Sequence, residues 1–480
     1  MYKFTLFIIL INYQVWSIDL SSYQAVFLAL RNNTALKVQE NNPKLIITQE
    51  KSSRAQFDSK LSAGIESSKT EGLRGYGDDE SFEKNKLRLS LSKKLKTGTT
   101  LELEGATSAD DINEDPVSNT KFNENIQFEI TQPLLKGRGK DISLIEVKKA
   151  RENHTISQSQ LKAYTMGLIA DVLNAYWNTY YLKAKLKMVK VSKELAQAQK
   201  ERVTNMIDAG DLAEIEAAAS QAELASRDEL VVSTQGDLDI QRIQLLALLN
   251  PEKSKLSWDT EFDKMDDPTK VSLELTEKKE TIQRGLVLRP EIEQVKHKLA
   301  INDLEVMQSR NGVLPKLDMF MRINRSKYRD TFSNGKSDKL DHGKEFAFGL
   351  SFTYALGQRA EKAKLEKNII SRDQQKLSFE NLKLAIEVDI RLSWIRVHKL
   401  KQKKQAASQT LKHMQKSVEA ELNKFNVGHS TSLNVARAQR DLLTAELGHL
   451  KTNIDIIKAL ISLAEADGTL IQDYVTLSDK

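Results

Sequence analysis

Residues 205–224 read NMIDAGDLAEIEAAASQAEL, where Gly210 and its neighbour Asp211 form the only strong break in the helix-forming residues that run from about Ile142 to Leu249. A glycine inside a helix costs about 1 kcal/mol relative to alanine. Glycine also adopts, without steric cost, the left-handed conformation that commonly ends a helix. We therefore expect Gly210 to end one long helix and to turn the chain back into the next.

The same pattern returns 218 residues later, in ELNKFNVGHSTSLNVARAQRDLL at residues 421–443, where Gly428 takes the place of Gly210. A second offset, of 256 residues, aligns Leu30–Leu36 with Leu286–Ile292. The two offsets differ because the first copy contains roughly 35 additional residues in its β-rich segment. The chain is therefore predicted to consist of two direct repeats.

The repeats divide the chain into five expected segments. These are a signal peptide at 1–17, a first repeat at 18–250, an inter-repeat segment at 251–285, a second repeat at 286–472 and a tail at 473–480. Each repeat is expected to contain a short helix, a β-rich segment, a helix of about 100 Å, the glycine and a final helix. The expected helices are 34–58, 140–208 and 211–249 in the first copy, and 290–312, 358–426 and 429–470 in the second.

The N-terminal residues MYKFTLFIILINYQVWS place Lys3 before a short apolar stretch. This stretch is too short to span a bilayer, and Val15 and Ser17 suit the −3 and −1 positions of a cleavage site. We interpret the segment as a secretory signal peptide; a buried N-terminal helix is the alternative. No later segment contains 18 consecutive apolar residues. If the exported chain enters a membrane, it must therefore do so as β-strands.

Composition favours long helices over a large enzyme core. Of the 480 residues only 7 are proline and 20 glycine, and 29% are charged. No basic stripe is interleaved with aromatic residues, so nucleic-acid binding is not indicated. Because the chain contains no cysteine, disulfides, thiolate metal sites and a lipoprotein anchor are excluded.

No pattern for catalysis or cofactor binding is found. The 7 histidines lack metal-ligand spacing. Gly137-Arg138-Gly139 lies between an expected strand and an expected helix, but the third glycine or the Gly-Lys-Ser/Thr ending of a phosphate loop is missing. We therefore predict that the protein is not an enzyme and has no catalytic residue, cofactor or metal site.

Several segments alternate apolar and polar residues, as strands with two different faces do. The clearest one provides the membrane-facing candidates Phe346, Phe348, Leu350, Phe352 and Tyr354. Shorter examples are Leu87–Leu91, Leu101–Leu103, Ile126–Ile130 and Leu317–Ile323. A soluble half-buried sheet shows the same alternation, and so does a transmembrane barrel. Alternation alone leaves both interpretations open.

Polar segments at 72–83, 106–121 and 325–344 are expected to be loops at an outer mouth. The two repeats together supply four strands, or six if the additional residues of the first copy form a hairpin that joins them. Neither number can close a barrel alone. Because open sheet edges are not tolerated in lipid, we expect several copies of the chain around one axis.

Together these residues resemble the TolC-like outer membrane efflux proteins of Gram-negative bacteria. The resemblance rests on the repeat, on both glycine turns, on TQPLL at 131–135 followed by Gly137-Arg138-Gly139, and on LRPEI at 288–292. It implies an α+β membrane protein, exported to the cell outer membrane. In this homotrimer, long helical hairpins form a periplasmic α-barrel and the strands form a shared twelve-stranded β-barrel.

The function implied by this resemblance is a porin-like exit duct of a tripartite efflux pump or a type I secretion system. The strands would face outer-membrane lipid, and an inner-membrane pump of the RND or ABC type would send substrates through a periplasmic adaptor. The adaptor would dock at the helical tips: Asp208, Ala209, Gly210, Asp211, Asn426, Val427, Gly428, His429 and Ser430. No residue indicates the cargo.

The second tip departs from the family pattern, which commonly has acidic residues six and nine positions after the glycine. The chain has Asn434 and Arg437 there, whereas Glu216 follows the first glycine at six positions. We hypothesise that Glu216 pairs with Arg437 or Arg440 of a neighbouring hairpin and holds the entrance shut. The alternative is that these are solvated surface charges.

Two other functions remain open at this point. An exported coiled-coil scaffold or adhesin without transport activity would explain the helices, although it explains the strand alternation and the repeated strand–helix order less well. A periplasmic adaptor also contains helical hairpins, but it would need one hairpin flanked by lipoyl-like β-halves instead of two direct repeats.

Overall fold

The computed structural model describes residues 17–71, 81–114, 117–254, 256–271, 275–329 and 341–475. Except for Ser17, the predicted signal peptide lies outside these residues. The chain forms two compact units. Unit 1 comprises residues 1–41, 159–293 and 380–480, and unit 2 comprises residues 42–158 and 294–379.

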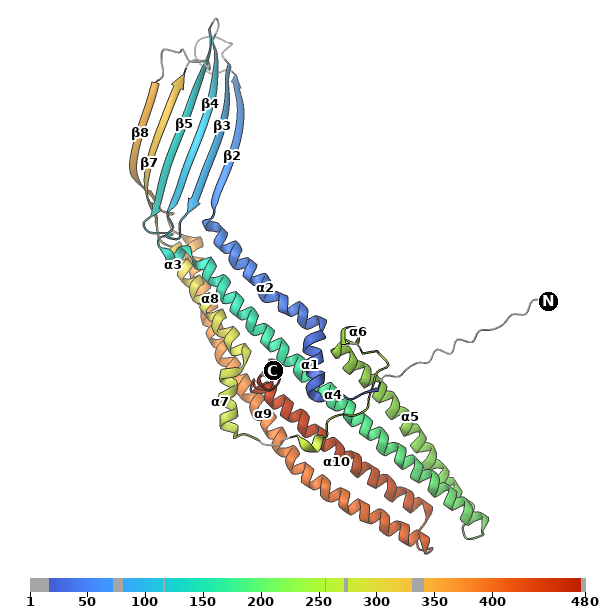
Figure 1. Ribbon diagram of the computed structural model, residues 1–480. Helices are drawn as coiled ribbons and strands as arrows, with labels where there is room; N and C mark the ends of the chain where they lie inside the picture. The colour runs from blue at the N-terminus through green and yellow to red at the C-terminus, as the bar shows by residue number, and fades with distance from the viewer. Residues whose placement is uncertain are drawn as a thin grey trace, which may run out of the picture. The chain divides into compact units, whose positions relative to one another are not determined.

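Unit 2 is built around a six-stranded antiparallel sheet with the strand order β2-β3-β4-β5-β7-β8 (Figure 1). The strands are β2 (Ser59–Glu71), β3 (Ser81–Lys94), β4 (Thr100–Glu114), β5 (Val117–Pro133), β7 (Lys316–Arg329) and β8 (Asp341–Thr353). The additional hairpin of the first repeat, β3–β4, therefore lies inside the sheet, between β2 and β5. This strand count differs from the four strands per chain that a twelve-stranded trimer requires.

The strands extend farther than the alternation predicts. β4 continues to Glu114 and β5 begins at Val117, so the predicted loop at 106–121 is wrong for most of its length. β3 likewise begins inside the predicted loop at 72–83, whose first part lies outside the described residues. In these outer parts the sequence places polar residues at successive positions, so the alternation disappears. The backbone ladder continues because its hydrogen bonds do not depend on the side chains.

The long helices form two hairpins (Figure 1). The first consists of α4 (Ile145–Asp208) and α5 (Ile215–Leu249), and the second of α9 (Arg359–Asn426) and α10 (Ser432–Ala466). The short helices α2 (Thr34–Arg54) and α8 (Pro290–Gly312) begin 256 residues apart, at the second offset found in the sequence. The remaining elements are β1 (Ser17–Ile18), α1 (Ser22–Asn32), η1 (Ala55–Phe57), α3 (Lys140–Ser143), α6 (Pro251–Ser254), β6 (Glu261–Phe262), η2 (Pro268–Lys270), α7 (Lys278–Leu288) and α11 (Leu470–Val475).

Both hairpins reverse through the same turn at a glycine. The φ angle is 86° at Gly210 and 77° at Gly428. At each tip the glycine amide donates to the carbonyl three residues earlier, and the next amide donates to the carbonyl five residues earlier, over 2.8–3.0 Å. This is the Schellman pattern, which satisfies the last carbonyls of a helix and needs a left-handed residue at the turn.

The core of unit 1 surrounds the fully buried Tyr176. Its hydroxyl donates to the carbonyl of Leu20 at 3.0 Å and accepts from the amide of Asp266 at 2.6 Å. Burial raises the pKa of Tyr176 above its ordinary value, which keeps the hydroxyl protonated and able to donate. This side chain therefore joins the first described residues to the inter-repeat segment.

Replacing either turn glycine tests the left-handed conformation. We expect Gly210→Ala and Gly428→Ala each to destabilise the protein by about 1–2 kcal/mol, because a Cβ penalises positive φ. At neither position would the added Cβ meet another atom within 4 Å, so the cost is conformational. The measurement is the thermal unfolding midpoint, followed by the circular dichroism of the helices.

The matched control is Gly236→Ala, because Gly236 lies inside α5 and a Cβ there also meets nothing within 4 Å. In this helical position alanine should stabilise by about 1 kcal/mol. Equal shifts for the three variants would contradict the assignment.

Candidate functional site

One face of the sheet is apolar across all six strands. A single row of paired residues shows this: Leu61, Leu91, Leu103, Phe128, Ile323 and Phe346 face one another in register from β2 to β8. The side chains on this face are widely exposed in the single chain, with 86% of Ile65, 51% of Leu89 and 65% of Phe348 accessible. An apolar surface that extends over a whole sheet usually contacts a membrane or another protein.

The five predicted membrane-facing residues occupy the β8 end of this face. Phe346, Phe348, Leu350 and Phe352 alternate along the strand, and Tyr354 lies one residue beyond its end. All five side chains are exposed. Their contact with lipid remains a prediction.

The opposite face of the sheet is polar and contains ion pairs between neighbouring strands. Arg88 of β3 contacts Glu104 of β4 at 3.3 Å, Lys84 contacts Asp110 at 3.9 Å, and Arg322 of β7 contacts Glu129 of β5 at 2.9 Å. Each such pair contributes at most about 1 kcal/mol. The contrast between the two faces suits a wall with water on one side and an apolar phase on the other.

The nine predicted docking residues form the two hairpin tips of unit 1. All are exposed except Ser430, which is half-buried and whose hydroxyl donates to the carboxylate of Glu421. The side-chain oxygen of Asn426 accepts from Arg202 of the other hairpin at 3.0 Å. Docking of an adaptor at these tips remains a prediction.

Three kinds of contact join the two tips within one chain. Val203, Phe425 and Val435 form a small buried cluster, in which Phe425 is only 2% exposed. Glu216 at the start of α5 accepts hydrogen bonds from the amide of Ser432, at 3.2 Å, and from its hydroxyl. The third contact is the Arg202–Asn426 hydrogen bond. The two hairpins are therefore coupled where their helices reverse.

The structure contains only part of the geometry that the gate hypothesis expects. Glu216 does reach the second hairpin, but within the chain its carboxylate contacts Ser432 instead of Arg437 or Arg440. Both arginines and Asn434 are exposed on α10. Any pairing of Glu216 with an arginine would have to involve another copy of the chain. Sequence spacing missed Ser432 because a serine beside a helix start is normally a cap.

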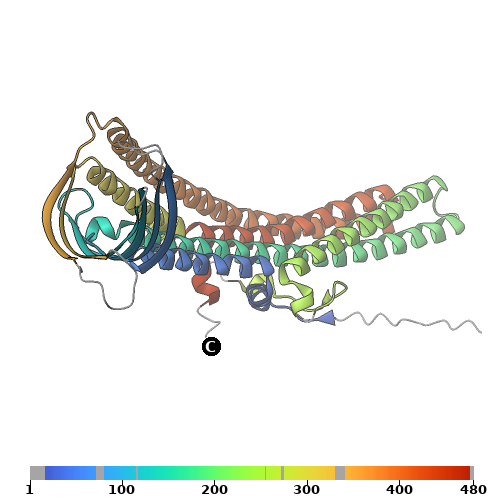
Figure 2. The same cartoon turned by 90° about the horizontal axis from the view of Figure 1, so that it is seen from above.

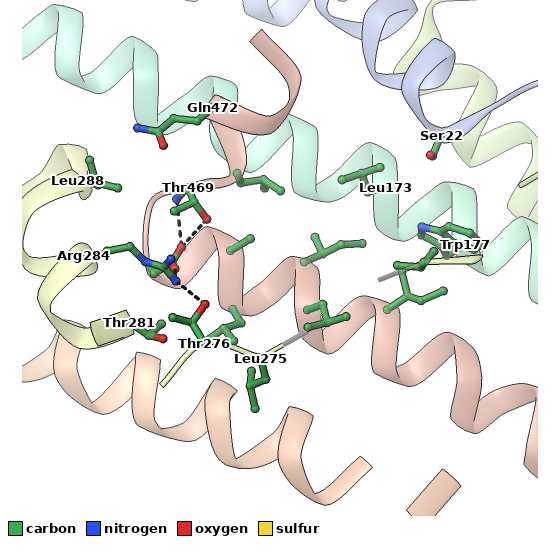
Figure 3. Close-up of a pocket in the computed structure, with 18 residues that line it drawn as sticks. Ser22, Leu173, Trp177, Leu275, Thr276, Thr281, Arg284, Leu288, Thr469 and Gln472 are labelled. Atoms are coloured by element: carbon green, nitrogen blue, oxygen red, sulfur yellow. Dashed lines mark hydrogen bonds and ion pairs between the residues drawn. The ribbon is translucent and has the colours of Figure 1, made fainter. Parts of the chain in front are cut away.

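Unit 1 also contains a cavity of about 600 Å³ beside the start of α11. Figure 3 shows Arg284 and Thr469 at its polar end. Arg284 donates to the buried carboxylate of Asp467 at 2.9 Å. The same carboxylate accepts from the amide and the hydroxyl of Thr469 at 3.1 and 2.7 Å. The walls near Leu173 and Trp177 are apolar. Through the contact between Arg284 and Asp467 this arrangement ties the end of α10 to α7.

Within the described part of the chain, no three His, Asp or Glu side chains come close enough together to hold a metal ion. None of the described helices is both long enough and apolar enough to cross a membrane.

Several solved outer-membrane channels have the same fold as this chain. The match to the outer-membrane channel OprN has a TM-score of 0.71 at 15% identity and covers 93% of this chain and 90% of that one. CusC, whose structures concern transmembrane channel formation, gives 0.69 at 16% identity and coverages of 95% and 94%. The CmeC outer membrane channel of Campylobacter jejuni gives 0.66 at 14% identity and coverages of 96% and 89%.

No curated protein matches the sequence at a significant level. The family model for outer membrane efflux proteins does match it, over residues 281–469, which contain most of the second repeat. The resemblance that the glycine turns and the repeat indicated is thus confirmed by the match of residues 281–469 to the outer membrane efflux protein family.

Proposed function

We propose that this protein is the outer-membrane exit duct of a tripartite efflux pump or a type I secretion system, and that it works as a homotrimer. In this role it conducts substrates passively, while an inner-membrane pump of the RND or ABC type and a periplasmic adaptor supply them. The observation that carries the proposal is the sheet with one exposed apolar face and one polar face. The fold of the solved channels supports the same role.

The sheet edges support assembly from several copies. Among the described strands, β2 and β8 each have a hydrogen-bonded neighbour on one side only. In lipid, unpaired backbone groups cost several kcal/mol each. A second copy whose β2 pairs with β8 removes this cost, and a ring of copies removes it at every junction.

Exposed apolar residues on two helices of unit 1 also support a ring of several copies of the chain. α5 exposes Val232, Ile240 and Ile243, and α9 exposes Leu384, Val388, Leu392 and Ile395 at helical spacing. With 73% of Val232 and 62% of Leu392 accessible, each stripe is poorly suited to water. Two different stripes that contact each other across copies form a head-to-tail interface, which closes when the rotation between copies closes.

The alternatives explain fewer of these observations. A coiled-coil scaffold or adhesin needs no sheet with an exposed apolar face. A periplasmic adaptor would need a single hairpin, whereas this chain has two.

Reconstitution tests the duct directly. We expect detergent-purified protein to have the mass of three chains and to give stable single-channel conductance in a planar bilayer. A detergent-independent soluble species without conductance would overturn the proposal and favour the scaffold.

Two adjacent positions in β8 test which sheet face meets lipid. Leu350 lies on the apolar face and Ser351 on the polar face, opposite Asp318 of β7. We expect Leu350→Arg to impair membrane assembly by about 2–4 kcal/mol, the cost of arginine near the bilayer midplane. Ser351→Arg should assemble normally, because its charge faces water. The measurement is the yield of outer-membrane trimer, and equal yields would contradict the assignment.

Substitutions of Glu216 test the gate. Glu216→Ala removes both the charge and the side-chain acceptor for Ser432, whereas Glu216→Gln keeps an acceptor oxygen. We expect Glu216→Ala to raise the ionic leak through the resting channel several-fold in bilayer recordings. If an arginine of a neighbouring copy supplies the closing contact, Glu216→Gln should leak equally; if Ser432 supplies it, only Glu216→Ala should leak.

The control for this test is Glu214→Ala, because Glu214 lies two residues before Glu216, is exposed and makes no side-chain capping hydrogen bond. An unchanged leak in both Glu216 variants would show that this residue does not hold the channel shut.

A further inference from the structure

We propose that three copies of this chain close an eighteen-stranded barrel, with the β3–β4 hairpin as part of its wall. This inference rests on the proposed function, because it needs the trimer. The partner at each sheet edge is a second copy of the same chain, which supplies β2 to the free edge of β8. Four strands per chain would give a barrel of twelve strands. Six strands per chain give one and a half times that number.

The hydrogen-bond ladder places the additional hairpin in the wall. β2 pairs with β3 along its full length from Ser59 to Glu71, and β4 pairs with β5 from Thr100 to Glu114. A hairpin folded into the lumen or away from the sheet would leave β2 to pair with β5. The observed order instead separates β2 from β5 by two complete strands.

The faces of the hairpin agree with those of the other strands. Leu87, Leu89 and Leu91 of β3 continue the apolar row from β2, and Leu103 of β4 continues it to Phe128 of β5. On the other side, the Arg88–Glu104 and Lys84–Asp110 pairs belong to the polar face. A plug surrounded by water would not need an apolar face directed to the same side as the rest of the sheet.

The geometry of the sheet allows closure. In Figure 2 the strands follow an arc with β2 and β8 at its two free edges. Because consecutive strands alternate in direction and the sheet has six of them, β2 of one copy is antiparallel to β8 of the next. Both edge strands carry their apolar residues on the same face, so the lipid-facing band continues across each junction.

The strand number sets the width of the barrel. At a strand spacing of about 4.8 Å and a tilt of about 40°, eighteen strands give a diameter of about 36 Å between strand axes, against about 24 Å for twelve. Barrels of this strand number leave a water-filled channel. The β-barrel would therefore be wide enough for bulky cargo to pass through it.

Paired cysteines test the wall, because the native chain has none. On the polar face of the sheet, Ser62 of β2 faces Ser90 of β3. Gln127 of β5 lies on the same face, two strands beyond Ser90. We expect Ser62→Cys with Ser90→Cys to form a disulfide within one chain upon oxidation. Ser62→Cys with Gln127→Cys should not, because about 14 Å separates strands three positions apart.

The junction between copies is tested in the same trimer. Ser62→Cys is combined in turn with Glu345→Cys, Ala347→Cys and Ser351→Cys, which scan the polar face of β8. Gly349 is left unchanged because a Cβ there would lie 2.7 Å from the ring of Phe320. We expect one of the three pairs to link the chains covalently into dimers and trimers. The strand count in a cryo-electron microscopy map of the unmodified trimer should be eighteen.

The outcomes separate this inference from the function on which it rests. A conducting trimer with twelve wall strands, or with a Ser62–Gln127 link, would overturn the eighteen-stranded barrel and leave the duct intact. A trimer without any link between β2 and β8 and with an unclosed sheet would overturn it as well. Protein that forms neither trimer nor channel would instead remove the proposed function.

Discussion

The free edges of the six-stranded sheet must be paired with other strands if the sheet lies in lipid. The rest of the proposed assembly follows from this requirement. β2 and β8 each contain 13 residues, and in such a strand about half of the peptide groups direct their hydrogen bonds to the open side. Each unsatisfied group in lipid costs several kcal/mol. Two open edges would therefore cost more than the about 5–15 kcal/mol that stabilises a typical domain. In the proposed duct a single chain therefore cannot be the membrane-embedded form, and association is part of folding.

The two hairpin tips show how a repeated backbone carries different chemistry. Gly210 and Gly428 make the same Schellman turn, because positive φ admits few other residues. The side chains that follow are free of that constraint and have diverged: Glu216 in the first repeat corresponds to Asn434 in the second. A ring of three chains would therefore present six tips of two kinds. The Glu216–Ser432 contact couples the two kinds within each chain.

The sequence predicted the features that depend on local physics. Gly210 and Gly428 were identifiable because the same pattern around a glycine returns 218 residues later among helix formers, and Phe346–Phe352 because apolar residues occupy every second position. Where both strand faces become polar, as in 106–121, the alternation carries no information and the predicted loop was wrong. The position of β3–β4 inside the sheet could not be predicted from the sequence either, because strand order depends on backbone pairing between distant segments. The contact of Glu216 with Ser432 depends in the same way on the packing of two hairpins.

An inserted hairpin changes the barrel without disturbing the helices that flank it in the chain. β2 follows α2 and η1, and β5 leads into α3 and α4. One additional strand between β2 and β5 would make β5 end at the opposite edge of the membrane from α3. It would also make β8 and the next β2 parallel. Two additional strands, one in each direction, preserve both the connection to α3 and the antiparallel junction. The width of the proposed barrel can thus vary in steps of one hairpin per chain while the helical repeats keep their own geometry.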